Sequence, residues 1–232
     1  MKYALKRHSE RLGSVDLEIE TLDDLDKAIN DLCESADLKM QDAVFTEDLC
    51  PYFGVVWPAA RAVSEHVARM GGWMKDKRVL ELGCGLALPS LVAAKLGAKV
   101  VATDFHPDVP KFLERNIEIN GLKGTGALEY REYDWRAQAP LGEFDFVIGS
   151  DILYEASHPK NVARALAANC ARGSHIVLGD PGRVYLQACL DALTAMSFRS
   201  DVFIKSVRDG HVDRADDKPT KEVFVISLQR ML

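Results

Sequence analysis

A glycine-rich turn behind an acidic residue carries the clearest chemical signal in the sequence. It reads Glu81-Leu-Gly-Cys-Gly85 and separates an apolar run from a predicted helix. Gly83 and Gly85 permit a tight turn and the close approach of a ligand to the backbone. A dinucleotide fingerprint would place a third glycine where this chain has Leu88, and the Glu81 carboxylate would repel a pyrophosphate. The turn therefore favours a cationic ligand without phosphates.

Polar residues also follow the next two predicted strands. Asp104 stands about 20 residues after the glycines, at the position where an acidic residue accepts ribose hydroxyls. Asp134 and Trp135 offer a polar group and an aromatic plane to an adenine ring. Singly, these residues are explained by a turn, a helix cap or core packing. Together with Glu81 they predict a site for S-adenosyl-L-methionine, which carries a sulfonium and an ammonium and has no phosphate.

Asp151 and Tyr154 are the candidates for the other half of a reaction. Asp151 closes the apolar run 146–148, where a buried carboxylate without a role would be costly. The alternative explanations are that Asp151 caps a turn and that Tyr154 packs on the sheet edge. After the fifth predicted strand, either Asp180 or Arg183 lines the same pocket, or this segment is a tight turn with a surface arginine.

Short apolar strands alternate with amphipathic helices and hold these residues at strand ends. The predicted strands are 78–82, 99–103, 128–133, 144–150, 175–179, 201–207 and 222–228, and the predicted helices are 58–70, 89–96, 108–120, 159–170 and 184–196. This alternation predicts an α/β fold. We expect a Rossmann-like, doubly wound, seven-stranded and mostly parallel sheet with an antiparallel edge strand and helices on both faces. Ligands of such sheets bind beyond the carboxyl ends of the strands.

Residues 1–50 differ from the rest of the chain in charge. They hold six basic and thirteen acidic side chains, whereas residues 51–232 are close to neutral. Residues 14–20 alternate as in a half-buried strand, and Thr21 is expected to cap a helix that runs to Leu32. We therefore expect an acidic extension of one strand and one helix over 1–50, packed as a flank or lid on a domain over 51–232.

Composition narrows the class of protein. The 232 residues carry a net charge of −6 and are 47% hydrophobic, which predicts a folded globular chain. No apolar run approaches the roughly 20 residues of a membrane span, and no secretory signal is recognised, so a cytoplasmic location is expected. Lys and Arg form no cluster, which disfavours a nucleic-acid partner. The five cysteines are scattered and the histidines lack metal-ligand spacing, so neither a disulfide framework nor a metal is predicted.

The motifs together resemble the seven-β-strand methyltransferases, and more narrowly their family-16 group of protein lysine methyltransferases. The resemblance covers roughly 51–232 and rests on these segments: Trp57-Pro58, Glu81–Gly85, Thr103-Asp104, Asn116 to Asn120-Gly121, Tyr133-Asp134-Trp135 and Ser150-Asp-Ile-Leu-Tyr154. The glycine loop departs from the commoner family pattern, because Ala87 replaces a third glycine and Ser90 a later one. The resemblance implies that the following residues contact the cofactor: Trp57, Glu81, Gly83, Gly85, Asp104, Trp135 and Ser150. It also implies that Asp151 and Tyr154 face the methyl acceptor.

The implied activity is methylation of a lysine side chain in a protein substrate, with S-adenosyl-L-homocysteine as the product. A lysine ammonium must first lose its proton, and Asp151 and Tyr154 are the residues expected to dock and orient it. Two alternatives remain open, a small-molecule amine or heterocycle N-methyltransferase and a non-catalytic cofactor-binding partner subunit. RNA methylation is disfavoured, because Asp151-Ile-Leu-Tyr154 lacks the two prolines of an Asn/Asp-Pro-Pro-Tyr tetrapeptide.

Overall fold

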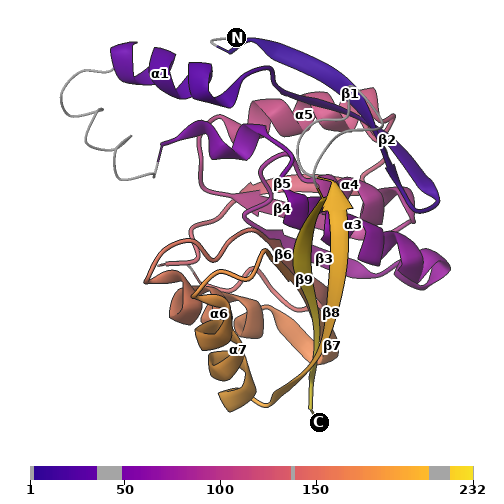
Figure 1. Cartoon of the computed structure of the whole chain (residues 1–232). Coiled ribbons are helices and arrows are strands. Elements are labelled where there is room, and N and C mark those ends of the chain that lie inside the picture. The colour runs from indigo at the N-terminus through magenta and orange to yellow at the C-terminus, as the bar shows by residue number, and fades with distance from the viewer. Residues whose placement is uncertain (1–2, 36–48, 137–138, 209–219, 232) are drawn as a thin grey trace.

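The core of the protein is a seven-stranded sheet (Figure 1). The computed structural model describes residues 3–35, 49–136, 139–208 and 220–231. In spatial order the strands are β5 (Leu128–Glu132), β4 (Lys99–Asp104), β3 (Arg78–Leu82), β6 (Phe144–Ser150), β7 (Cys170–Asp180), β9 (Thr220–Arg230) and β8 (Phe198–Arg208). The strands from β5 to β7 are parallel, and β9 runs antiparallel to both of its neighbours. The predicted α/β class and mostly parallel sheet are confirmed, with the reversed strand lying just inside β8.

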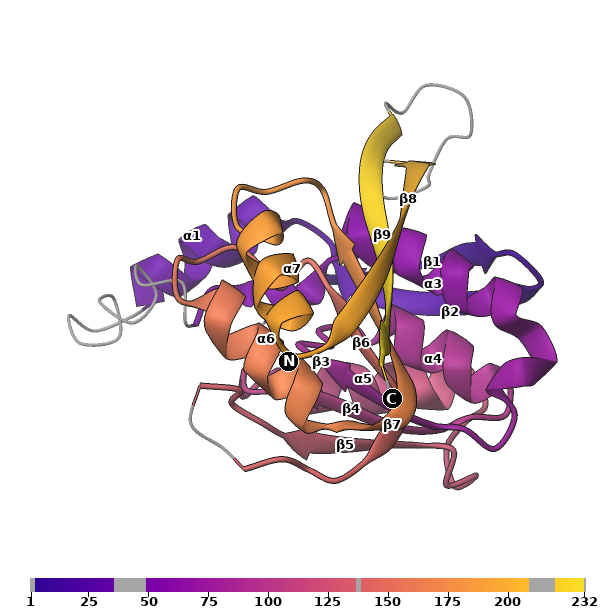
Figure 2. The same ribbon diagram turned by 90° about the horizontal axis from the view of Figure 1, so that it is seen from below.

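Helices cover both faces of the sheet, as Figure 2 shows. One layer contains α3 (Pro58–Met70), α4 (Leu88–Lys95) and α5 (Val109–Ile119), and the other contains α6 (His158–Ala168) and α7 (Leu186–Ala195). Neighbouring residues of a strand point to opposite faces. Accordingly, Val79 packs in the core cluster beneath α3 and α4, whereas Leu80 packs in the cluster beneath α6 and α7. No described helix is long and apolar enough to cross a bilayer.

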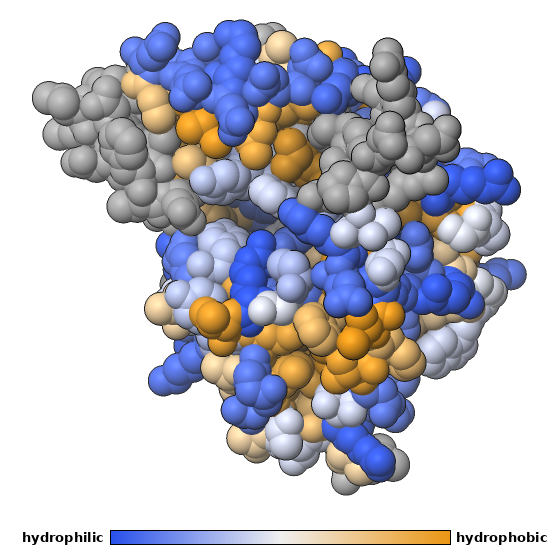
Figure 3. All heavy atoms as spheres, in the orientation of Figure 1, coloured by the Kyte–Doolittle hydropathy of each residue, from blue (hydrophilic) through white to orange (hydrophobic). Residues whose placement is uncertain are grey.

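The N-terminal part forms a hairpin followed by a helix. Strands β1 (Leu5–Leu12) and β2 (Val15–Leu22) pair antiparallel, and α1 (Leu25–Ser35) follows. The predicted strand corresponds to β2, and β1 was not predicted. The expected cap Thr21 lies in β2 instead, and the Asp24 carboxylate accepts the Lys27 N–H at the start of α1. The outer surface over α1 and the hairpin is mainly hydrophilic (Figure 3).

Two asparagines, Asn116 in α5 and Asn120 at the C-terminal cap of that helix, hold the free edge of β2. The Asn116 amide accepts the backbone N–H of Glu20 at 2.8 Å and donates to its carbonyl at 3.2 Å. The Asn120 amide makes the same pair of bonds with Glu18, at 3.0 and 2.7 Å. Residues four apart on a helix share a face, and residues two apart on a strand share an edge. The two amides therefore replace a neighbouring strand and fix the hairpin on α5.

A buried ion pair attaches the same hairpin to α3. The Arg61 guanidinium donates to the Glu10 carboxylate at 2.6 Å, and both side chains are 5% exposed. The His8 ring contacts the same carboxylate at 3.1 Å. Burial alone would raise the pKa of Glu10, but the contacts with His8 and Arg61 outweigh it and hold this pKa below its ordinary value. The hairpin is thus joined to two helices of the sheet by polar contacts as well as by its apolar core residues.

We expect Asn116→Ala to lower the free energy of unfolding by about 1–3 kcal/mol, because the backbone N–H and C=O of Glu20 would lose their partners inside the protein. Denaturant unfolding measures the loss. Asn161→Ala on α6 is the matched control, because within the described part of the chain the Asn161 side chain makes one long contact, from Arg164 at 3.5 Å. A loss at Asn116 no larger than the loss at Asn161 would contradict the assigned role.

Candidate functional site

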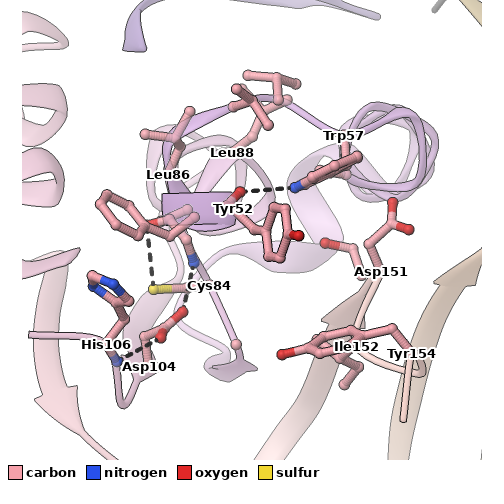
Figure 4. A pocket seen from close by; sticks show the side chains of 18 of the residues that line it. Tyr52, Trp57, Cys84, Leu86, Leu88, Asp104, His106, Asp151, Ile152 and Tyr154 are labelled. Atoms are coloured by element: carbon pink, nitrogen blue, oxygen red, sulfur yellow. Dashed lines mark hydrogen bonds between the residues drawn. The ribbon is translucent and has the colours of Figure 1, made fainter. Parts of the chain in front are cut away.

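A cavity of about 270 Å³ opens at the carboxyl ends of β3, β4 and β6. The short 3-10 helix η1 (Pro51–Gly54) and the start of α3 form its opposite wall. Eight of the predicted site residues line this cavity: Trp57, Gly83, Gly85, Asp104, Trp135, Ser150, Asp151 and Tyr154. In Figure 4, Asp104 lies with His106 on one side of the cavity, and Asp151 lies on the other.

The glycine loop follows β3 and packs tightly against its surroundings. Gly83 and Gly85 have φ angles of +62° and +50°, in the left-handed region that favours glycine. A Cβ atom on Gly83 would lie 2.8 Å from a methyl group of Ile152, and one on Gly85 would lie 3.0 Å from the Phe53 carbonyl. Ala87, which replaces the third family glycine, is also left-handed, with φ +59°. The substitution therefore keeps the backbone turn that the glycine would allow.

Asp104 ends β4 and is partly exposed to the cavity. Its carboxylate accepts the backbone N–H groups of Gly85 and His106, both at 3.0 Å. Burial raises the pKa of Asp104, and these two N–H bonds act in the opposite direction. The bonds fix the carboxylate next to the glycine loop, in the place where the sequence predicted an acceptor for ribose hydroxyls.

Glu81 does not line the cavity, because its side chain is fully buried behind the glycine loop. One carboxylate oxygen accepts the Ser90 N–H at 3.0 Å and the Ser90 hydroxyl at 2.5 Å. Among the residues that the structure describes, the other oxygen has no hydrogen-bond partner. Burial, together with the nearby charge of Asp104, raises the pKa of Glu81 to about 8.

Glu81 and Asp104 form an acidic pair without a counter-ion. Among the residues that the structure describes, no Lys or Arg side chain pairs with either carboxylate. Each charge raises the cost of ionising its neighbour, so a bound cation would stabilise both. The orphaned oxygen of Glu81 and the exposed edge of Asp104 therefore fit a cationic cofactor, as the sequence predicted.

Aromatic rings enclose the space between the two ends of the cavity. The Trp57 indole N–H donates to the Tyr52 carbonyl at 2.9 Å, which fixes the ring at the start of α3. Trp135 is 8% exposed and lies beneath Gly83, with its ring edge toward His158. Tyr52 and Phe53 also line the cavity but were not predicted, because η1 carries no motif that marks it as part of a site.

Asp151 sits in a strained turn just after β6. Its φ angle is +59°, and its N–H donates to the Gly179 carbonyl at 3.0 Å. The carboxylate accepts the Ala59 N–H at the start of α3, at 3.2 Å. Arg183 donates to the other carboxylate oxygen at 2.6 Å. Burial nevertheless raises the pKa of Asp151, against the lowering effect of Arg183.

The loop after β7 thus contributes to the cavity through Arg183. The sequence left this residue open between a pocket residue and a surface arginine. Tyr154 is 39% exposed, and its ring packs edge-on against His158 with the centroids 4.5 Å apart. Arg183 and Tyr154 lie on the same side of the cavity as Asp151. The two predicted acceptor residues, Asp151 and Tyr154, are therefore brought together.

Asp134 is a predicted cofactor residue that lies outside the lining of the cavity. Its carboxylate pairs with the Arg136 guanidinium at 3.0 Å. This ion pair lowers the pKa of Asp134. Trp135, the next residue, faces the cavity instead. The role of Asp134 toward adenine stays a prediction.

Three comparisons relate the chain to known proteins. It is 34% identical to the histone-arginine methyltransferase METTL23 of Xenopus laevis, over 46% of this chain and 47% of that protein. It is 29% identical to the protein N-lysine methyltransferase METTL21A of Xenopus tropicalis, over 73% and 80% of the two chains. A SAM-dependent O-methyltransferase from Thermotoga maritima superposes with a TM-score of 0.60 at 16% identity, over 97% of this chain and 78% of that one, which shows a shared fold.

The chain spans about half the length, or less, of most of the curated relatives that it matches. The sequence profile described as lysine methyltransferase matches residues 21–184. That range begins in β2, contains the glycine loop, Asp104 and Asp151, and ends just after Arg183. On this match, the chain belongs to the lysine methyltransferase family.

Proposed function

We propose that the protein is an S-adenosyl-L-methionine-dependent methyltransferase that methylates a lysine side chain of a protein substrate. The observation that carries the proposal is the pairing of two different acidic sites at one cavity. Asp104, backed by Glu81, presents negative charge at one end, and Asp151 presents a carboxylate beside Tyr154 at the other. One end suits a cationic cofactor and the other a cationic side chain.

When bound, S-adenosyl-L-methionine supplies an electrophilic methyl group on its sulfonium. Asp104 would accept hydrogen bonds from the ribose hydroxyls, and the glycine loop would let the cofactor approach the backbone. Trp57 and Trp135 would provide apolar walls that exclude water. Because the displacement is in line, most of the rate comes from holding the acceptor nitrogen in position.

On the acceptor side, Asp151 docks the lysine ammonium and Tyr154 directs it toward the centre of the cavity. The ammonium loses its proton to solvent before transfer, since a protonated amine has no lone pair. The hydrogen bond from the Ala59 N–H fixes the position of the Asp151 carboxylate while the substrate enters. Its role is to bind and orient the amine rather than to serve as a base.

Two other acceptors are the alternatives that the experiments below separate. A small amine or heterocycle would enter the same cavity, whose walls are partly apolar. An arginine side chain is the second alternative, and one observation supports it: Asp151 already binds a guanidinium, that of Arg183. A cytoplasmic location stays a prediction from the sequence.

We expect Asp104→Asn to weaken binding of S-adenosyl-L-methionine about 10- to 100-fold, because a charged acceptor of hydrogen bonds is lost. Isothermal titration calorimetry measures the change. Asp191→Asn on the surface of α7 is the control and should bind as the unmodified protein does. If Asp104→Asn binds S-adenosyl-L-methionine as tightly as the unmodified protein does, Asp104 does not contribute to cofactor binding.

Glu81→Gln should change stability and binding in opposite directions. Because the pKa of Glu81 is about 8 in the folded protein and near 4.5 when unfolded, the folded state keeps a proton that the unfolded chain releases between these values. Glu81 therefore lowers the stability of the cofactor-free protein as pH rises from about 4.5 to about 8. Glu81→Gln removes this contribution, so at pH 8 the variant should have a free energy of unfolding a few kcal/mol higher than the unmodified protein, while it binds the cofactor more weakly.

Denaturant unfolding at pH 5 and pH 8 checks this prediction, since the two proteins should differ at pH 8 and agree at pH 5. A variant less stable than the unmodified protein at pH 8 would show that Glu81 is already balanced by a cation.

Asp151→Asn should lower transfer of labelled methyl from S-adenosyl-L-methionine into protein by about 10- to 100-fold. The assay uses a cell extract fractionated into protein, RNA and small molecules, followed by hydrolysis of the labelled protein to amino acids. Asp145→Asn, at the opposite end of the same strand β6, is the matched control. Label in methyllysine supports the proposal, whereas label in methylarginine or in the small-molecule fraction supports an alternative acceptor.

A further inference from the structure

The acceptor carboxylate is already occupied by a cation of the protein itself. The Arg183 guanidinium lies 2.6 Å from one oxygen of Asp151 and 3.2 Å from one oxygen of Asp180. Asp151 and Asp180 are 7% and 1% exposed in their side chains, whereas the Arg183 side chain is 30% exposed. In this cluster of three residues the two carboxylates are buried, whereas the guanidinium side chain reaches the surface.

Both carboxylates keep other partners that do not depend on the guanidinium. Asp180 accepts the backbone N–H groups of Gly182 and Arg183, at 2.8 and 2.6 Å. Asp151 accepts the Ala59 N–H, and its own N–H is bound to Gly179. Departure of the guanidinium would therefore leave the two carboxylates in place and hydrogen-bonded.

The charges in this cluster do not balance. Two buried carboxylates face one guanidinium, so the cluster holds a net negative charge even with Arg183 bound. Arg183 lines the same cavity as Asp151 and Tyr154, which are the residues proposed to receive the substrate side chain. A second cation that entered the cavity would meet the Arg183 guanidinium at the Asp151 oxygen.

We propose that Arg183 is a resident cation that takes the place of the substrate's ammonium on Asp151 and must leave it for substrate to bind. The proposal rests on the proposed function, because it identifies the substrate side chain as the cation that displaces Arg183. Substrate without a positive charge would gain nothing from Asp151 and would not displace the guanidinium. The apparent affinity for a cationic acceptor is then lowered by the fraction of protein in which Arg183 is bound.

The test measures binding of n-butylammonium, the analogue of the lysine side chain, to protein saturated with S-adenosyl-L-homocysteine at pH 8. Calorimetry compares the unmodified protein with Arg183→Gln, which removes the cation, and Arg183→Lys, which retains one. Arg11→Gln, in an exposed ion pair with Asp16, is the matched control. Equal affinity of all four proteins for S-adenosyl-L-homocysteine shows that each is folded.

We expect Arg183→Gln to bind n-butylammonium about tenfold more tightly than the unmodified protein, and Arg183→Lys and Arg11→Gln to bind it as the unmodified protein does. Equal or weaker binding by Arg183→Gln would overturn the proposal and make Arg183 a fixed part of the pocket. With the labelled protein substrate from the extract, Arg183→Gln should lower KM without raising kcat, and a higher KM would likewise overturn it.

The two proposals fail separately. If Arg183→Gln binds n-butylammonium more tightly but no extract yields labelled methyllysine, Arg183 is a displaceable cation and the proposal of lysine methylation is wrong. If methyllysine is labelled but Arg183→Gln gains no affinity for n-butylammonium, the proposed activity holds and the proposed displacement is wrong.

Discussion

Negative charge gathered at the carboxyl ends of neighbouring parallel strands is the constraint on which the rest of the site depends. Glu81 is the last residue but one of β3, Asp104 ends β4, Asp151 follows β6 and Asp180 ends β7. Burial makes ionisation of such groups costly unless hydrogen bonds or cations compensate. The fold supplies at least one backbone N–H group to each of the four, and Glu81 also accepts the Ser90 hydroxyl. The positive charge that these carboxyl groups still lack favours the binding of cationic ligands.

The two ends of the cavity meet this deficit differently. On the cofactor side no Lys or Arg of the described residues forms an ion pair with Glu81 or Asp104, so a cationic ligand is the natural source of positive charge, and the pKa of Glu81 is about 8 without it. On the acceptor side Arg183 supplies a charge from within the chain. One end of the cavity therefore favours a cationic cofactor, and the other end favours acceptors that can compete with a guanidinium.

The sheet, its helices and most of the cavity lining could be predicted from the sequence, because the glycine loop and the polar residues after each strand are local patterns. Strand β1 could not be predicted, because its inward residues include His8 and Glu10 rather than apolar side chains, and their burial depends on Arg61 in α3. The docking of β2 on Asn116 and Asn120 and the contact of Arg183 with Asp151 also join residues far apart in the chain. No spacing within one element indicates such contacts.

Proton release on cofactor binding tests the central claim about charge most directly. The heat of binding of S-adenosyl-L-methionine, measured at pH 7 in buffers of different ionisation enthalpy, gives the number of protons released. Since Glu81 is mostly protonated at this pH in the free protein, ionisation on binding should release close to one proton, and Glu81→Gln should release almost none. Binding with no release from the unmodified protein, or with equal release from both proteins, would contradict the account.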